Sequence, residues 1–93
     1  MNKYESMYIL KPNLDEEARN EQIARFKSLI EENGGKVENV DEWGNRKLAY
    51  EINYIGEGYY VLMTFESSPE FPVELERVYK INDNVMRFNV IRL

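Results

Sequence analysis

Two runs of residues in this chain carry large apolar or aromatic side chains at both odd and even positions. They are residues 3–10 (KYESMYIL) and 59–66 (YYVLMTFE). Successive side chains of a β-strand point to opposite faces of its sheet, so a run that is apolar at both parities is typical of a strand in the centre of a sheet. Both runs are therefore expected to be strands, and residues 3–10 are expected to occupy a central position.

A helix is expected after the first of these strands. Its apolar stripe consists of residues at helical spacing: Ala18, Ile23, Phe26, Leu29 and Ile30. Asn13 is the predicted N-cap, because Glu16 stands three residues later in a capping-box arrangement. Gly34-Gly35 predicts the end of the helix in a left-handed cap.

The next segment, residues 36–52, leaves two interpretations open. Its clearest alternating apolar residues are Leu48, Tyr50 and Ile52. Gly44-Asn45 interrupts the pattern, so the segment is either one long strand that bends at Gly44 or two strands joined there. The first is favoured, because a single Gly inside a strand often marks a bulge. Residues 53–58, with two glycines, are expected to form a turn.

A second helix is predicted after residues 59–66. Its apolar stripe consists of Phe71, Leu75, Val78 and Tyr79. Ser68 can cap a helix whose first residue is Pro69, whereas Pro72 makes a later start equally compatible with the sequence. Asn82-Asp83-Asn84 then turns the chain, and residues 85–92 (VMRFNVIR) are expected to form the last strand.

The predicted order is β-α-β-β-α-β, in a single domain that spans residues 1–93. This order indicates an α+β, ferredoxin-like fold with a four-stranded antiparallel sheet. Right-handed crossovers put both helices on one face of the sheet. The residues expected to face the helices are Tyr4, Tyr8, Leu10, Val61, Met63, Phe65, Phe88 and Val90.

The opposite parity of the strands is expected to lie on a sheet face that no helix covers. Its apolar residues are Met7, Ile9, Tyr60, Leu62 and Ile91. An apolar patch on an uncovered sheet is a candidate interface. These five residues are therefore predicted to contact a protein partner.

The composition excludes several kinds of chemistry. The chain has no Cys and no His, so disulfides, thiolate metal sites and ordinary histidine acid–base catalysis are not expected. It contains no Walker loop and no GxGxxG motif, and its acidic clusters are better explained as solvated helix residues than as metal ligands. No enzyme activity, metal or cofactor is expected. No segment is apolar enough to span a membrane and no signal pattern is present, which predicts a cytoplasmic protein.

The charge balance argues weakly against a nucleic-acid partner, because 17 acidic and 12 basic residues give a net charge of −5. The position of the basic residues matters more than their total. Those on predicted strands with few acidic neighbours are Lys3, Arg46, Lys47, Arg87 and Arg92. Lys3 and Arg92 are expected near each other, because the first and last strands would be antiparallel neighbours. Composition alone favours ordinary surface charge for all five residues.

A resemblance to a known family changes that balance. Residues 44–52 (GNRKLAYEI) are similar to the signature of the bacterial small-subunit ribosomal protein six family, which has the pattern Gly-x-basic-polar-Leu-small-Tyr-x-Ile. Further matches are Tyr4-Glu5, Asp41-Glu42-Trp43, Gly58-Tyr59-Tyr60 and Asn82-Asp83-Asn84-Val85. The resemblance covers essentially the whole chain.

The resemblance implies a ferredoxin-like fold and a structural role in the ribosome. It implies binding to the central domain of the small-subunit ribosomal RNA as a heterodimer with ribosomal protein eighteen, during subunit assembly. The residues expected to bind RNA are Lys3, Tyr4, Arg46, Lys47, Arg87 and Arg92. Some members of the family carry Arg at the second position, where this chain has Asn2.

Two functions of other classes are also compatible with the residues alone. One is a small regulatory or enzymatic domain that binds a metabolite, for which Arg87 and Asn89 are candidates by residue type. No glycine-rich anion loop precedes a helix, however. The other is a module that dimerises through the open face of its sheet.

Overall fold

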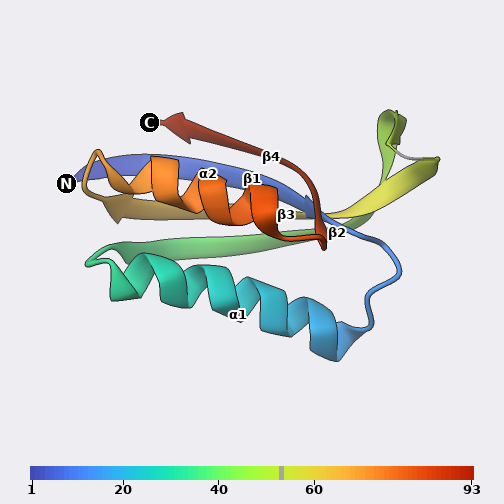
Figure 1. Ribbon diagram of the computed structural model, residues 1–93, viewed down its shortest axis with the longest axis horizontal. Coiled ribbons are helices and arrows are strands. Elements are labelled where there is room, and N and C mark those ends of the chain that lie inside the picture. The colour runs from blue at the N-terminus through green and yellow to red at the C-terminus, as the bar shows by residue number, and fades with distance from the viewer. Residues whose placement is uncertain (53) are drawn as a thin grey trace.

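The computed structural model describes residues 1–52 and 54–93. The elements follow the order β-α-β-β-α-β (Figure 1). They are β1 (Asn2–Leu10), α1 (Glu16–Glu32), β2 (Lys36–Ile52), β3 (Ile55–Ser67), α2 (Phe71–Ile81) and β4 (Val85–Arg92). The predicted number, type and order of elements are confirmed.

The four strands form one antiparallel sheet in the order β2-β3-β1-β4. The two doubly apolar runs lie in β1 and β3, the inner strands, as their pattern predicts. Both helices cover the same face of this sheet (Figure 1). The α+β ferredoxin-like architecture expected from the sequence is therefore the observed one.

The core lies between that face and the helices, and aromatic rings fill its centre. The rings of Tyr8, Phe26 and Tyr79 contact one another, with centroids 4.9–5.2 Å apart. All three side chains are at most 1% exposed. Rings at these separations add to stability beyond the apolar area that they bury. The helix-facing strand residues that the sequence predicts are buried there or packed against the core.

Two local expectations need correction, and one alternative that the sequence leaves open is resolved. The N-cap of α1 is Asp15 rather than Asn13, because the Asp15 carboxylate accepts a hydrogen bond from the Ala18 amide at 2.8 Å. The later start of α2 is the observed one, since Glu70 is the N-cap and Pro72 lies in the first turn. The predicted turn at 53–58 is too long, because β3 already begins at Ile55. Asn53, also part of that prediction, lies outside the described residues.

Gly44 bends a single long strand, which confirms the favoured interpretation of residues 36–52. The register of β2 against β3 shifts between Glu42 and Gly44, and Gly44 has a φ of 86°. A left-handed backbone inside a strand is strained for residues with a Cβ, so Gly is the residue that fits this bulge. Beyond it, the ends of β2 and β3 extend past the helical layer (Figure 1).

Two buried tyrosines carry their hydroxyl groups into the core. Burial raises the pKa of Tyr8, and the neighbouring Tyr79 and Glu42 raise it further. Burial also raises the pKa of Tyr79, whose hydrogen bond with the Ser6 hydroxyl at 2.6 Å acts weakly in the opposite direction. The Tyr8 hydroxyl has no hydrogen-bond partner among the described residues. The folded chain therefore favours the neutral form of both phenols.

Raising the pH above about 10, the ordinary pKa of tyrosine, is expected to destabilise the fold. Because the folded pKa values are raised, the unfolded chain releases these protons first, and stability falls as the pH rises. The expected loss reaches about 1.4 kcal/mol per pH unit for each of the two phenols. Urea unfolding at a series of pH values between about 8 and 11 measures it.

Tyr8→Phe is the control for this prediction. It removes one of the two raised phenols, so the alkaline slope should fall by about half. Stability at neutral pH should stay equal or rise, because the lost hydroxyl has no partner among the described residues. A profile that stays flat through the alkaline range would show that these hydroxyls reach solvent.

Candidate functional site

The sheet face opposite the helices carries a continuous apolar patch. Met7 of β1 lies directly opposite Leu62 of β3 in the register, and both are half-buried. Ile91 of β4 lies opposite Glu5 and is 45% exposed. A side chain that is half-covered by its own sheet can lose its remaining exposed area only to a partner. These residues therefore fit the predicted partner surface.

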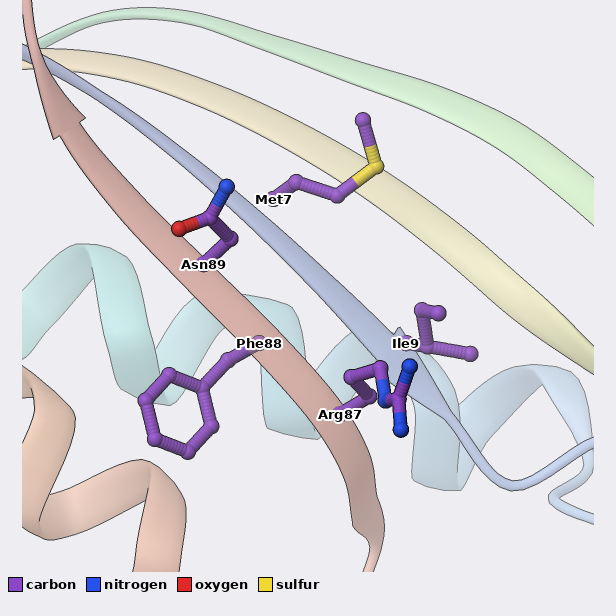
Figure 2. A pocket seen from close by; sticks show the side chains of 5 residues that line it. All are labelled: Met7, Ile9, Arg87, Phe88 and Asn89. Atoms are coloured by element: carbon purple, nitrogen blue, oxygen red, sulfur yellow. The ribbon is translucent and has the colours of Figure 1, made fainter. Parts of the chain in front are cut away.

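A depression of about 300 Å³ lies beside this patch, between β1 and β4. Its lining residues are Met7, Ile9, Arg87, Phe88 and Asn89. Figure 2 shows that Phe88 points away from the other four, and Phe88 packs against the core. Asn89 and Arg87 lie opposite Met7 and Ile9 in the register, so polar groups border the apolar floor along β4.

Ile9 is less accessible than its parity predicts. Its side chain is only 5% exposed, although it belongs to the open face. The end of β2 explains this burial, because Leu48, Tyr50 and Ile52 line a small depression together with Ile9. Leu48 is itself only 9% exposed. The end of β2 therefore covers one end of the face, and Ile9 supports the patch from below.

Tyr60 is held by an aromatic neighbour that sequence reasoning did not assign to the site. Its ring is stacked on Trp43, with centroids 6.3 Å apart and an interplanar angle of 8°. The guanidinium of Arg46 lies 5.1 Å from the centroid of Trp43. The indole N–H of Trp43 donates to the Asp41 carboxylate at 3.1 Å. Residues three apart on a regular strand point to opposite faces, and the register of β2 shifts around Trp43, just before Gly44, so strand periodicity alone does not predict the contact of Trp43 with Arg46.

Arg87 is held in a similar way from the opposite edge of the sheet. Its guanidinium lies 4.8 Å from the centroid of the Tyr50 ring and donates a hydrogen bond to the Tyr50 hydroxyl. Tyr50 belongs to β2 and Arg87 to β4, which are the two outer strands. Sequence reasoning assigned Tyr50 to packing, yet its side chain is 58% exposed. No sequence signal connects two residues that are 37 positions apart.

Arg46, Lys47 and Arg87 lie at one end of the sheet. Arg46 and Lys47 are opposite Gly58 and Glu57 of β3, and Arg87 is opposite Ile9 near the end of β1. All three side chains are exposed. Three of the predicted RNA-binding residues therefore lie at the end of the sheet from which the β2 and β3 ends extend, with Arg46 and Lys47 on opposite sides of β2.

Lys3 and Arg92 lie at the other end, where the two termini are neighbours (Figure 1). Arg92 is opposite Tyr4 in the register, next to Lys3, so the predicted proximity is observed. The two side chains point to opposite faces, however. Lys3 forms an ion pair with Glu38 at 3.6 Å, whereas Arg92 donates to the Asn2 side-chain oxygen at 3.3 Å.

Tyr4 lies in the core rather than on a surface. It is 7% exposed, and its ring is stacked on Phe65 with centroids 5.7 Å apart. Its hydroxyl accepts a hydrogen bond from the Asn2 side chain at 3.3 Å. The ring is therefore unable to stack on a base in this conformation.

The described part of the chain offers little for other kinds of site. Within residues 1–52 and 54–93, no group of three acidic side chains comes together in a way that could hold a metal ion. No helix in the same ranges is both long and apolar enough to cross a membrane. The open face is thus the surface on which exposed arginines, stacked aromatic rings and an apolar patch come together.

Comparison with known proteins shows the family of the chain. The family model described as ribosomal protein S6 matches residues 3–92. Small ribosomal subunit protein bS6 of Clostridium novyi is 59% identical over 98% of this chain and 96% of its own length. The same protein of Thermoanaerobacter pseudethanolicus is 60% identical over 99% and 97%.

A solved structure extends the comparison to three dimensions. The crystal structure of 30S ribosomal protein S6 from Thermotoga maritima superposes with a TM-score of 0.93 at 38% sequence identity. The match covers 99% of this chain and 87% of that one. Sequence and fold agree over the whole described structure, and the chain belongs to the ribosomal protein S6 family.

Proposed function

We propose that the protein is a structural component of the bacterial small ribosomal subunit, in the cytoplasm. It binds the central domain of the small-subunit ribosomal RNA together with ribosomal protein eighteen during assembly. The observation that carries the proposal is the near full-length similarity to relatives that are named small ribosomal subunit proteins. The proposed role is one of binding, and it requires no catalytic group.

The apolar patch on the open face is the surface proposed for ribosomal protein eighteen. Met7, Leu62 and Ile91 supply apolar contacts, and Tyr60 is fixed by its stacking on Trp43. Aromatic side chains with few remaining degrees of freedom are favoured at interfaces, because little conformational entropy is lost on binding. Ile9 contributes from beneath, by supporting the patch.

The exposed cationic side chains are proposed to contact RNA phosphates. Arg46, Lys47 and Arg87 lie at one end of the sheet, and Lys3 and Arg92 lie at the other end, on opposite faces. Tyr4 is left out of this set because its ring is buried. A guanidinium held over an aromatic ring still has N–H groups that can bind phosphate oxygens. Arg46 and Arg87 both have this arrangement.

Because the chain has a net charge of −5, most of the positive charge needed for RNA binding is expected to come from ribosomal protein eighteen. An acidic chain gains little from phosphate neutralisation unless a basic partner supplies much of the positive field. The protein alone is therefore expected to bind the RNA weakly. Together with ribosomal protein eighteen it is expected to bind tightly and in a strongly salt-dependent way.

Replacing Arg46 and Arg87 together with Ala is expected to weaken assembly with the RNA and ribosomal protein eighteen about tenfold or more. Each lost phosphate contact should also lower the slope of log affinity against log salt by about one. Filter binding of the in-vitro-transcribed central domain, with ribosomal protein eighteen present, measures both quantities. Folding should be unchanged, because both side chains are exposed.

Arg77→Ala is the matched control. Arg77 is an exposed arginine on the helical side, where it pairs with Glu74 at 2.6 Å. This variant removes the same charge from a surface with no proposed RNA contact, so the salt slope should stay the same. Wild-type RNA affinity in the Arg46/Arg87 double variant would remove both residues from the proposed RNA surface.

A further inference from the structure

The contact between Tyr50 and Arg87 joins the two outer strands across the open face. The order β2-β3-β1-β4 places two whole strands between them. Tyr50 reaches β4 because the end of β2 passes over Ile9, and the three residues line one depression. The contact is therefore a product of the tertiary fold and not of strand pairing.

Tyr50 contributes little to the core. Its side chain is 58% exposed, whereas Leu48, two residues earlier on the same face, is 9% exposed. Leaving a large aromatic ring exposed to water is unfavourable for the free protein, because its apolar area stays hydrated. The side chain makes two interactions with Arg87, a cation–π contact and a hydrogen bond.

Both interactions restrict the guanidinium without using up its donors. The Arg87 Cζ lies over the Tyr50 ring, 4.8 Å from its centroid, and one nitrogen donates to the Tyr50 hydroxyl. An arginine has five N–H donors in one plane, so the remaining ones stay available at the edge. A free arginine would lose much rotamer freedom on binding a phosphate, whereas this one has already lost part of it.

We propose that Tyr50 is a positioning residue, which holds the Arg87 guanidinium over the open face in an orientation ready to bind an RNA phosphate. The role rests on the proposed function and deepens it. It assigns to Tyr50, whose position in the chain suggests packing alone, a share in RNA affinity that is exerted through Arg87. It also implies that the end of β2 sets the orientation of the Arg87 guanidinium on β4.

The test compares Tyr50→Ala, Tyr50→Phe, Arg87→Ala and the Tyr50→Ala/Arg87→Ala double variant. RNA affinity is measured over a range of salt concentrations, on the transcribed central domain with ribosomal protein eighteen present. Tyr50→Ala should weaken binding about two- to fivefold, which corresponds to an exposed cation–π contact. It should also lower the salt slope, although it removes no charge. A purely packing role has no means of changing that slope.

Tyr50→Phe and the double variant test whether Tyr50 affects RNA affinity through Arg87. Tyr50→Phe keeps the stacking ring, so it should restore most of the affinity and slope. The double variant should bind no more weakly than Arg87→Ala, because Tyr50 acts through that side chain. Tyr54→Ala is the control, since Tyr54 belongs to the same region and is 97% exposed. It should leave affinity and slope at wild-type values.

Three outcomes would overturn the positioning role. The first is an unchanged slope in Tyr50→Ala, and the second is additive losses in the double variant. The third is wild-type affinity and slope in Arg87→Met, whose apolar chain still packs on the ring without a charge. That result would mean that the contact only clamps the end of β2. Failure of wild-type protein to bind the RNA under any condition would instead refute the proposed function itself, and the positioning role with it.

Discussion

Replacing Phe26 with Ala is expected to lower the free energy of unfolding by about 3–5 kcal/mol. Phe26 is fully buried and contacts the rings of Tyr8 and Tyr79, with centroids 5.0 and 4.9 Å away. The loss combines the transfer of the ring to water with a cavity that two large rigid neighbours fill poorly. Urea unfolding measures it as a lower midpoint with an unchanged m-value.

Two variants control for this prediction. Phe26→Leu keeps most of the apolar volume and should cost distinctly less than the Ala variant. Val73→Ala shortens a residue of α2 that is 71% exposed, so it should change stability by less than about 0.5 kcal/mol. A loss for Phe26→Ala as small as that of Val73→Ala would mean that the aromatic centre of the core is not formed as described.

This centre was largely predictable, because periodicity reports which side chains face inward. The helical spacing of Ile23, Phe26 and Ile30 places them on one stripe, and all three are buried. The strand parity that includes Tyr8 and Met63 is likewise the buried one. Burial of an apolar face dominates the energetics of a small domain, so a clear pattern leaves few alternatives.

The helix start was predicted less well, because two residues of the same kind compete for the cap. Asn13 and Asp15 both have side chains that can accept a backbone N–H. Glu16 favours Asn13 through the capping-box spacing, yet Asp15 is the residue whose carboxylate reaches Ala18. The choice depends on where the chain leaves β1 and turns. That is set by packing and not by the local sequence.

The local sequence also does not show which glycines are required because another part of the chain packs closely against them. Gly34-Gly35 predicts a left-handed cap, and Gly34 has a φ of 83°. Gly35 is needed for a different reason, because a Cβ there would lie 2.7 Å from the carbonyl oxygen of Glu66. Gly58 lies within β3, where a Cβ would collide with the Ile9 side chain. Such close contacts join segments far apart in the chain, and no local pattern encodes them.

The open face was predicted as a surface, but its boundaries were not. Parity places Met7, Ile9 and Leu62 on one face, and it is correct for all three. It does not show that the end of β2 covers Ile9 or that Tyr50 meets Arg87. Both follow from the length and bend of β2 beyond Gly44, which are tertiary properties. The arginines were identified by residue type, whereas their aromatic supports required the structure.

Leu62→Lys is expected to weaken association with ribosomal protein eighteen by about a hundredfold. Leu62 lies in the middle of the apolar patch, opposite Met7, and is half-buried by its own sheet. A lysine there would have to be desolvated on binding and would face the positive charge of a basic partner. The measurement is isothermal titration calorimetry of the two proteins without RNA. Without RNA, an added positive charge has no phosphate to attract.

The free protein should tolerate Leu62→Lys, since Asp41 lies directly opposite this position on β2 and can pair with the new ammonium group. Far-UV circular dichroism and urea unfolding confirm that the fold is kept. Val73→Lys is the matched control, because it adds the same charge to an exposed site on the helical side. It should leave the association unchanged. Wild-type affinity in well-folded Leu62→Lys would move the partner to another surface, and the arginines would then be the only part of the open face with a proposed role.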